Sequence, residues 1–208
     1  MKATQLYNTA QVFAIIVIVT VVSESDRERC CEVMPAEKTF TQSEVRDIVD
    51  KMARTLAMLY YYMGSEVTAQ FGVEGEAAVR RAIHKYGEAR GRKIHKEVTG
   101  TGLPLTVENL SRYYDLPLPL AWVSKKIKVE ENYLEKQVVY CPFAEQWKEM
   151  GGEKLGLIYC EQDLCMRKGY NKGFDLQQFT NVLNGDAHCH TVVQWQKNDK
   201  QIAEDGHV

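Results

Sequence analysis

Apolar residues at helical spacing mark the first half of the chain. Residues 41–44 have the form of a capping box, and apolar residues then recur three and four positions apart to about Phe71. A second run of this kind covers residues 74–98 and stops near residues 100–102, which include two glycines. The pattern predicts two long helices that are separated at Gly72.

Shorter apolar runs fill the second half of the chain. Alternating apolar and polar residues between turn residues are typical of strands. In chain order, the pattern predicts a helix over 107–114, strands over 122–129 and 133–140, helices over 143–150 and 153–167, and strands over 176–183 and 188–195. The dipeptide Asn184-Gly185 favours a tight turn in the second hairpin. The order indicates an α+β fold: a single domain with long helices packed on an antiparallel sheet.

The first predicted hairpin has its own polarity pattern. Val123 and Ile127 alternate with Ser124, Lys126 and Lys128. Because successive side chains of a strand point to opposite faces, this alternation predicts an antiparallel pair with one face exposed.

An unbroken apolar run covers residues 12–22. Its eleven residues are too few to span a bilayer, which needs about 20. Only Lys2 supplies a positive charge before it, and no typical cleavage site follows. A buried strand, an N-terminal extension, a signal peptide and a membrane anchor all stay open. We expect a cytoplasmic protein, with secretion or anchoring through this run as the alternative.

Composition completes the domain prediction. The chain has 208 residues, of which 45% are hydrophobic and 26% charged, enough for one buried core. We expect an apolar segment and polar linker over 1–40, the α+β domain over 41–197 and a polar tail over 198–208. The formal net charge of -2 predicts no nucleic-acid partner. Oligomeric state is not predicted.

Thiols, carboxylates and imidazoles gather between residues 138 and 190. Cys160 and Asp163 lie three apart on a predicted helix and share a face, whereas Cys165 points away. On the last strand Cys189 faces opposite to His188 and His190. Either Cys189 joins Cys160 and Asp163, or the two histidines line a zinc or other divalent metal site. The cysteine spacing matches no zinc-finger pattern and favours reduced thiols, so we expect no cofactor.

Arg90 interrupts the apolar stripe of the second helix. It lies ~20° from Val79 on the helical wheel. Gly87 and Gly91 flank it and would let another backbone approach closely. A buried guanidinium needs a carboxylate partner or an anionic ligand, unless it reaches solvent. Such a cation could lower the pKa of a nucleophilic thiol, although buried cysteines are most often simply small apolar residues.

Four short segments also carry a family resemblance. They are Tyr86-Gly87-Glu88-Ala89-Arg90-Gly91, Cys141-Pro142, Tyr159-Cys160-Glu161-Gln162-Asp163 and Leu183-Asn184-Gly185-Asp186-Ala187-His188-Cys189. With them, residues 43–196 resemble the L-2-amino-thiazoline-4-carboxylic acid hydrolase family, whose members are bacterial-type proteins. The resemblance implies attack on the carbon between nitrogen and sulfur of a cyclic amidine-like ring, which opens to an N-carbamoyl cysteine.

The resemblance also implies site residues. The catalytic candidates are Cys160, Asp163, Asp186 and Cys189, and the substrate-binding candidates are Tyr86, Arg90 and Cys141. We expect Cys160 or Cys189 to act as nucleophile or thiol ligand and Asp163 as general base or orienting acid. Arg90 would hold a substrate carboxylate or balance Asp163. His188 and His190 depart from the family pattern.

These observations predict a hydrolase that acts on a non-peptide C–N or C–S bond of a small cyclic carboxylate. Two alternatives stay open at this stage. One is a ligand-binding or sensory domain without catalysis, with a membrane tether as a less favoured addition. The other is a protein with a metal site built from Cys160, Asp163 and the histidines.

Overall fold

The computed structural model describes residues 39–195. The predictions for the apolar run over 12–22, for the linker up to residue 38 and for the polar tail from 196 on lie outside the described residues. Among residues 39–195, no helix is long and apolar enough to cross a membrane.

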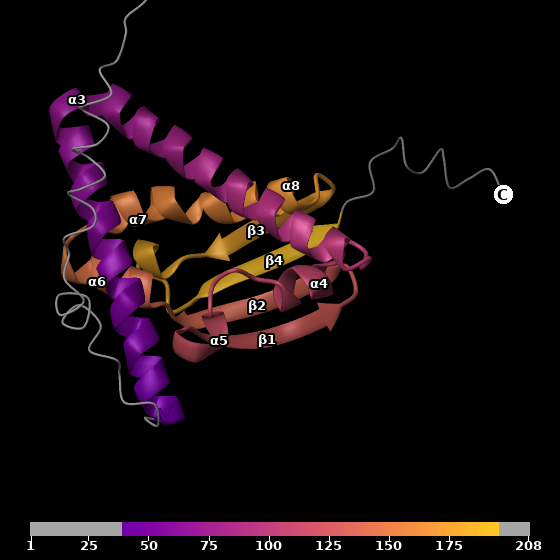
Figure 1. The fold of residues 1–208 in the computed structure, drawn as a ribbon. Helices are drawn as coiled ribbons and strands as arrows, with labels where there is room; N and C mark the ends of the chain where they lie inside the picture. Colours follow the sequence, from indigo (N-terminus) through magenta and orange to yellow (C-terminus); the bar gives the residue numbers. More distant parts are fainter. Residues whose placement is uncertain (1–38, 196–208) are drawn as a thin grey trace, which may run out of the picture. The chain divides into compact units, whose positions relative to one another are not determined.

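Helix α3 (Gln42–Gly100) contains both predicted long helices. Its start is a capping box: the Glu44 main-chain N–H donates to the Thr41 hydroxyl at 3.2 Å, and the Glu44 carboxylate accepts from the Thr41 N–H at 2.8 Å. Gly72 has φ 57° and ψ -131° inside the helix. Residues other than glycine rarely adopt this backbone φ. The helix bends at Gly72 into two limbs (Figure 1). The predicted separation at Gly72 is confirmed.

The remaining elements follow α3 in chain order. They are α4 (Val107–Arg112), α5 (Leu118–Ala121), β1 (Val123–Glu130), β2 (Tyr133–Tyr140), α6 (Pro142–Glu149), α7 (Glu153–Cys160), α8 (Gln162–Tyr170), β3 (Phe174–Thr180), the 3-10 helix η1 (Val182–Asn184) and β4 (Cys189–Trp195). The strands form one sheet in the order β1-β2-β4-β3. All three pairings are antiparallel, so the predicted α+β fold is confirmed.

Two predicted elements differ in detail. The helix expected over 153–167 is two helices, α7 and α8, with Glu161 between them. The strand expected to continue to residue 183 ends at Thr180, and the chain then enters η1. Gly185 follows with φ 90°, the left-handed conformation that a glycine adopts at little cost.

Two buried clusters hold the helices on the sheet. One gathers Ala53, Ala57, Phe143, Trp147, Tyr159 and their neighbours beneath the first limb of α3. The other joins the second limb to α4, α8 and the sheet through Ile94, Val98, Met166, Tyr170 and Phe174, all of them fully buried. The second limb runs past α8 in Figure 1, and added Cβ atoms at Gly87 and Gly91 would meet the α8 main chain. The close approach predicted at these glycines is therefore confirmed.

The expectation of one buried face was wrong for β1. Every residue of this strand is exposed, whereas β2 is partly buried. β1 is an edge strand of the sheet. Its residues Ser124 and Lys126 border a pocket, and no apolar core covers them.

Candidate functional site

Most of the predicted catalytic residues line one small cavity. It has a volume of about 130 Å³ and is lined by the thiols of Cys141, Cys160 and Cys189 together with Asp163. We call it the thiol cavity. The structure thus brings together three of the four predicted catalytic residues and one predicted substrate-binding residue. Asp186 lies elsewhere.

The side chains that line the thiol cavity come from different helices and strands. Cys160 ends α7 and Asp163 lies in the first turn of α8. Glu161 between them keeps helical angles, with φ -61° and ψ -24°, so the break does not separate the two side chains. Cys141 links β2 to α6, and Cys189 begins β4.

The thiols are free and protonated at neutral pH. No disulfide joins Cys141, Cys160, Cys165 and Cys189, the described cysteines. Burial raises the pKa of the Cys160 thiol far above its ordinary value, and the negative charge of Asp163 adds to the rise. Burial likewise raises the pKa of Cys141 to about 11 and that of Cys189 in the same direction. A thiolate would therefore need a base to form.

Asp163 is ionised. Burial raises the pKa of its carboxyl group, but the positive charges of Arg167, Lys136 and Arg90 lower it by more, so the net shift is downward. The Tyr114 hydroxyl donates to Asp163 Oδ1 at 3.3 Å, and Arg167 Nη1 donates to the same oxygen at 3.3 Å. Asp163 therefore presents a carboxylate to the thiol cavity at neutral pH.

Arg90 is buried and has a carboxylate partner. It is 5% exposed. Its Nε donates to Asp115 Oδ2 at 2.9 Å and its Nη2 to Asp115 Oδ1 at 2.5 Å, while Nη1 donates to Gln162 Oε1 at 2.5 Å. The guanidinium also lies over the rings of Tyr86 and Tyr114. These partners differ from the predicted substrate carboxylate, and Arg90 does not line the thiol cavity. Its charge still lowers the pKa of Asp163.

Tyr86 and Asp186 also lie outside the thiol cavity. Tyr86 is 39% exposed, and its ring packs near that of Tyr159 at 6.2 Å. Asp186 is exposed, and its Oδ2 accepts from the main-chain N–H of Asn181 at 2.8 Å. This bond holds the turn between η1 and β4, which positions Cys189.

The two histidines are not among the described residues that line the thiol cavity. His190 Nε2 contacts Glu135 Oε1 at 2.8 Å, and the ring of His188 lies 6.5 Å from that of His190. As predicted from strand alternation, Cys189 packs with the buried residues while His190 pairs with a neighbouring strand. Within residues 39–195, no group of three His, Cys, Asp or Glu side chains could hold a metal ion.

Two cations of the thiol cavity were not predicted. Arg167 is 5% exposed, and Lys136 on β2 is partly buried; both line the cavity with Asp163. Arg167 lies four residues after Asp163, a spacing that places both on one helix face and could have been noticed. Lys136 gave no such signal, because strand alternation does not tell which face borders a cavity.

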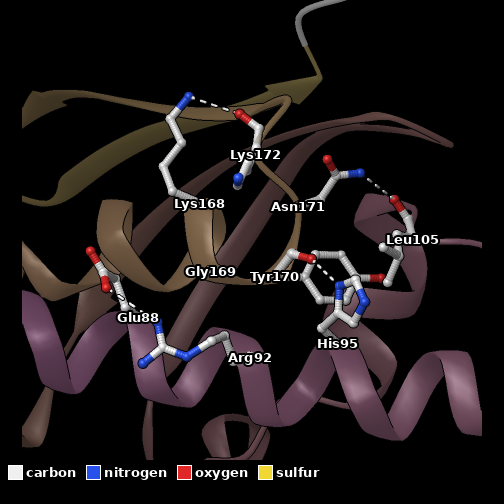
Figure 2. A pocket seen from close by; sticks show the side chains of 9 residues that line it. All are labelled: Glu88, Arg92, His95, Leu105, Lys168, Gly169, Tyr170, Asn171 and Lys172. Atoms are coloured by element: carbon white, nitrogen blue, oxygen red, sulfur yellow. Dashed lines mark hydrogen bonds and ion pairs between the residues drawn. The ribbon is translucent and has the colours of Figure 1, made fainter.

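A larger pocket lies between the second limb of α3 and the end of α8. It has a volume of about 580 Å³, and Figure 2 shows its lining residues. Arg92 pairs with Glu88 at 3.2 Å, and His95 Nδ1 contacts the Tyr170 carbonyl at 2.7 Å. Lys168 Nζ donates to the Lys172 carbonyl at 3.5 Å. These polar groups are engaged with one another, and no cysteine is among the described residues that line this pocket.

Comparisons with known proteins give two distant structural neighbours. No curated protein matches the chain. A solved structure of the phenol-responsive sensory domain of the transcription activator PoxR with phenol is 11% identical, with 70% of this chain and 80% of that chain covered and a TM-score of 0.46. A trafficking protein particle complex subunit 3 from Naegleria fowleri, covalently bound to palmitic acid, is 13% identical, with 70% and 95% covered and a TM-score of 0.44.

The predicted family resemblance is confirmed. The sequence model of the L-2-amino-thiazoline-4-carboxylic acid hydrolase family matches residues 51–193, well over half of the chain. This chain belongs to the L-2-amino-thiazoline-4-carboxylic acid hydrolase family.

Proposed function

We propose that the chain hydrolyses a small cyclic carboxylate in the thiol cavity, opening its ring at the carbon between nitrogen and sulfur. The observation that carries this proposal is the ionised carboxylate of Asp163 in a cavity walled by three thiols. Family membership supports the substrate class. Free thiols agree with a reducing compartment such as the cytoplasm.

Asp163 is the general base in this proposal. It is the only carboxylate among the residues described as lining the cavity. It accepts one proton from water as the water oxygen bonds to the ring carbon. The carbon–sulfur bond then breaks, and Asp163 returns the proton to the departing sulfur. The second water proton moves to the ring nitrogen, so a carbamoyl group and a free thiol form.

The same base could serve a thiol nucleophile, Cys160 or Cys189. That route needs an extra step, because each thiol must first lose its proton. Burial raises the pKa of both thiols, and this favours water as the attacking group. The thiols then act as the wall against which the ring packs.

Ring opening of L-2-amino-thiazoline-4-carboxylate tests the proposal, because the product carries a new thiol that can be titrated. We expect Asp163→Asn to lower kcat at least about 100-fold, the scale of a lost general base. Asp47→Asn, on an exposed residue of α3, is the matched control. Cys160→Ala and Cys189→Ala should retain activity if water attacks, with Cys165→Ala as their control outside the cavity.

Each outcome has a definite meaning. Undiminished activity of folded Asp163→Asn would remove Asp163 as the base. Loss of activity in Cys160→Ala or Cys189→Ala, with Cys165→Ala unaffected, would assign that thiol as the nucleophile. Circular dichroism melts of every variant separate loss of chemistry from loss of fold.

A ligand-binding domain without catalysis is the second candidate. Such a domain needs no nucleophile, so the protonated state of all three cavity thiols agrees with it as well as with attack by water. In that case the thiazoline would raise the melting temperature of the protein, and no new thiol would appear on prolonged incubation.

A further inference from the structure

Two cations in the wall of the thiol cavity lack full compensation. The ammonium of Lys136 has no hydrogen bond or ion pair within 39–195. Arg167 Nη1 donates to the Asp163 carbonyl at 2.6 Å and to its carboxylate at 3.3 Å. Arg167 Nε, however, is buried and has no acceptor. This donor is enclosed by protein atoms, so it adds to the cost of the buried positive charge of Arg167 and offers no contact to a ligand.

The charges of the cavity do not balance. Lys136 and Arg167 are the cations among its described lining residues, and Asp163 is the single anion. With the thiols protonated and Lys136 in its charged form, one positive charge is in excess. An excess charge in a partly dry cavity is costly, and a ligand with one negative charge would remove that cost.

An adjoining outer pocket carries the same sign of charge. It has a volume of about 660 Å³ and shares Lys136 and Arg167 with the thiol cavity. Arg46, Arg112 and Lys126 also line it, and its described lining includes no Asp or Glu. Lys126 lies directly opposite Lys136 in the pairing of β1 with β2. Like charges facing each other across strands destabilise a sheet, so this arrangement also calls for an anion.

We propose that Arg167 and Lys136 form the binding site for the ligand carboxylate, at the boundary between the outer pocket and the thiol cavity. The Lys136 ammonium donates to the carboxylate oxygens, which are strong acceptors for charged donors. The Arg167 guanidinium, which lines both pockets, supplies the second positive charge. The ring of the ligand then extends toward Asp163 and Cys160. This assignment rests on the proposed function only in using the same cavity. It gives to Arg167 and Lys136 the role that the sequence suggested for Arg90.

The test uses a ligand that cannot be hydrolysed. Thiazolidine-4-carboxylate has no amidine group to hydrolyse, and its carboxamide replaces the carboxylate by a neutral amide of similar size. We expect calorimetric titration of the full chain to show the carboxylate binding at least about tenfold more tightly than the carboxamide. Lys136→Met should lower carboxylate affinity at least about tenfold and leave carboxamide affinity unchanged. Lys125→Met, an exposed lysine of β1 outside both cavities, should change neither.

Arg167→Met provides a second variant, because it removes the positive charge and keeps a flexible side chain. It should weaken carboxylate binding while a melt verifies the fold. Equal affinity of wild-type protein for acid and amide, or unchanged binding by Lys136→Met, would overturn the assignment. So would failure of both compounds to bind.

The assignment and the proposed function fail in different ways. If the protein opens the 2-amino-thiazoline acid and its amide at equal kcat/KM, hydrolysis stands and the carboxylate site falls. If thiazolidine-4-carboxylate binds in a Lys136-dependent manner and no ring opening occurs, the carboxylate site stands and hydrolysis falls.

Discussion

At the scale of the residue, Lys136 lowers the stability of the folded chain. Burial and the positive charge of Arg167 lower its pKa, with a smaller contribution from Lys126, while Asp163 and Cys141 act in the opposite direction. The unfolded chain therefore binds more protons than the folded one between the lowered pKa and the ordinary value of about 10.5. Stability rises with pH in that window, and the cost is fully present below it.

Substitution of Lys136 by methionine should remove this cost. We expect Lys136→Met to raise the free energy of unfolding at neutral pH by on the order of 1 kcal/mol, because a flexible apolar side chain of similar length replaces an uncompensated charge. The gain should shrink as pH rises from the lowered pKa of Lys136 toward the ordinary value of about 10.5, because the folded wild-type protein releases the proton first. Urea unfolding at both pH values measures the difference. A variant less stable than wild type at pH 7 would contradict the account.

At the scale of the element, the contact between α3 and α8 places two of the three charged residues of the site. Asp163 and Arg167 both lie on α8. A Cβ at Gly91 would collide with the Met166 carbonyl and the Tyr170 nitrogen of that helix. A clash with main-chain atoms cannot be relieved by a change of side-chain rotamer, so the whole of α8 would have to move.

Gly91→Ala should therefore destabilise the fold and disturb the site. We expect a loss of about 3 kcal/mol, typical of severe overpacking, together with weaker carboxylate binding. Gly100→Ala is the matched control, because it lies in the same helix and nothing would stand within 4 Å of its new Cβ. It should be neutral or stabilising by up to about 1 kcal/mol. Chemical denaturation and calorimetry of both variants provide the comparison, and equal stability would refute the close-packing argument.

Local sequence signals predicted the helices and strands better than the tertiary contacts that these elements make. Gly72 ends the first helical run because only glycine fits its backbone angles readily, and this was visible in the sequence. The division at Glu161 was not, since no glycine or proline stands there and the angles stay helical. Helical phase still placed Cys160 at the end of α7 and Asp163 at the start of α8 in the same cavity, because the backbone stays helical between them. The partner of Arg90 is Asp115, 25 residues away in the chain, and only the fold could reveal it.

At the scale of the whole molecule, charge is unevenly distributed. The chain has a formal net charge of -2, yet the outer pocket collects five cations and no described acid. Net charge predicted no nucleic-acid partner, but it concealed this local positive region, because composition contains no positions. Pockets lined by one sign of charge concentrate oppositely charged ligands and speed their association.

Carboxylate association should therefore depend on salt and on the cations around the outer pocket. The Debye length falls from about 10 Å at 0.1 M salt to about 3 Å at 1 M, so the association rate of thiazolidine-4-carboxylate should fall across this range. The double variant Arg112→Gln and Lys126→Gln should lower that rate severalfold at low salt and leave the dissociation rate nearly unchanged, as expected for charges that steer without direct contact. Stopped-flow mixing measures both rates, and the neutral carboxamide should show neither effect. A salt-independent rate for the carboxylate would mean that these charges play no part in its entry.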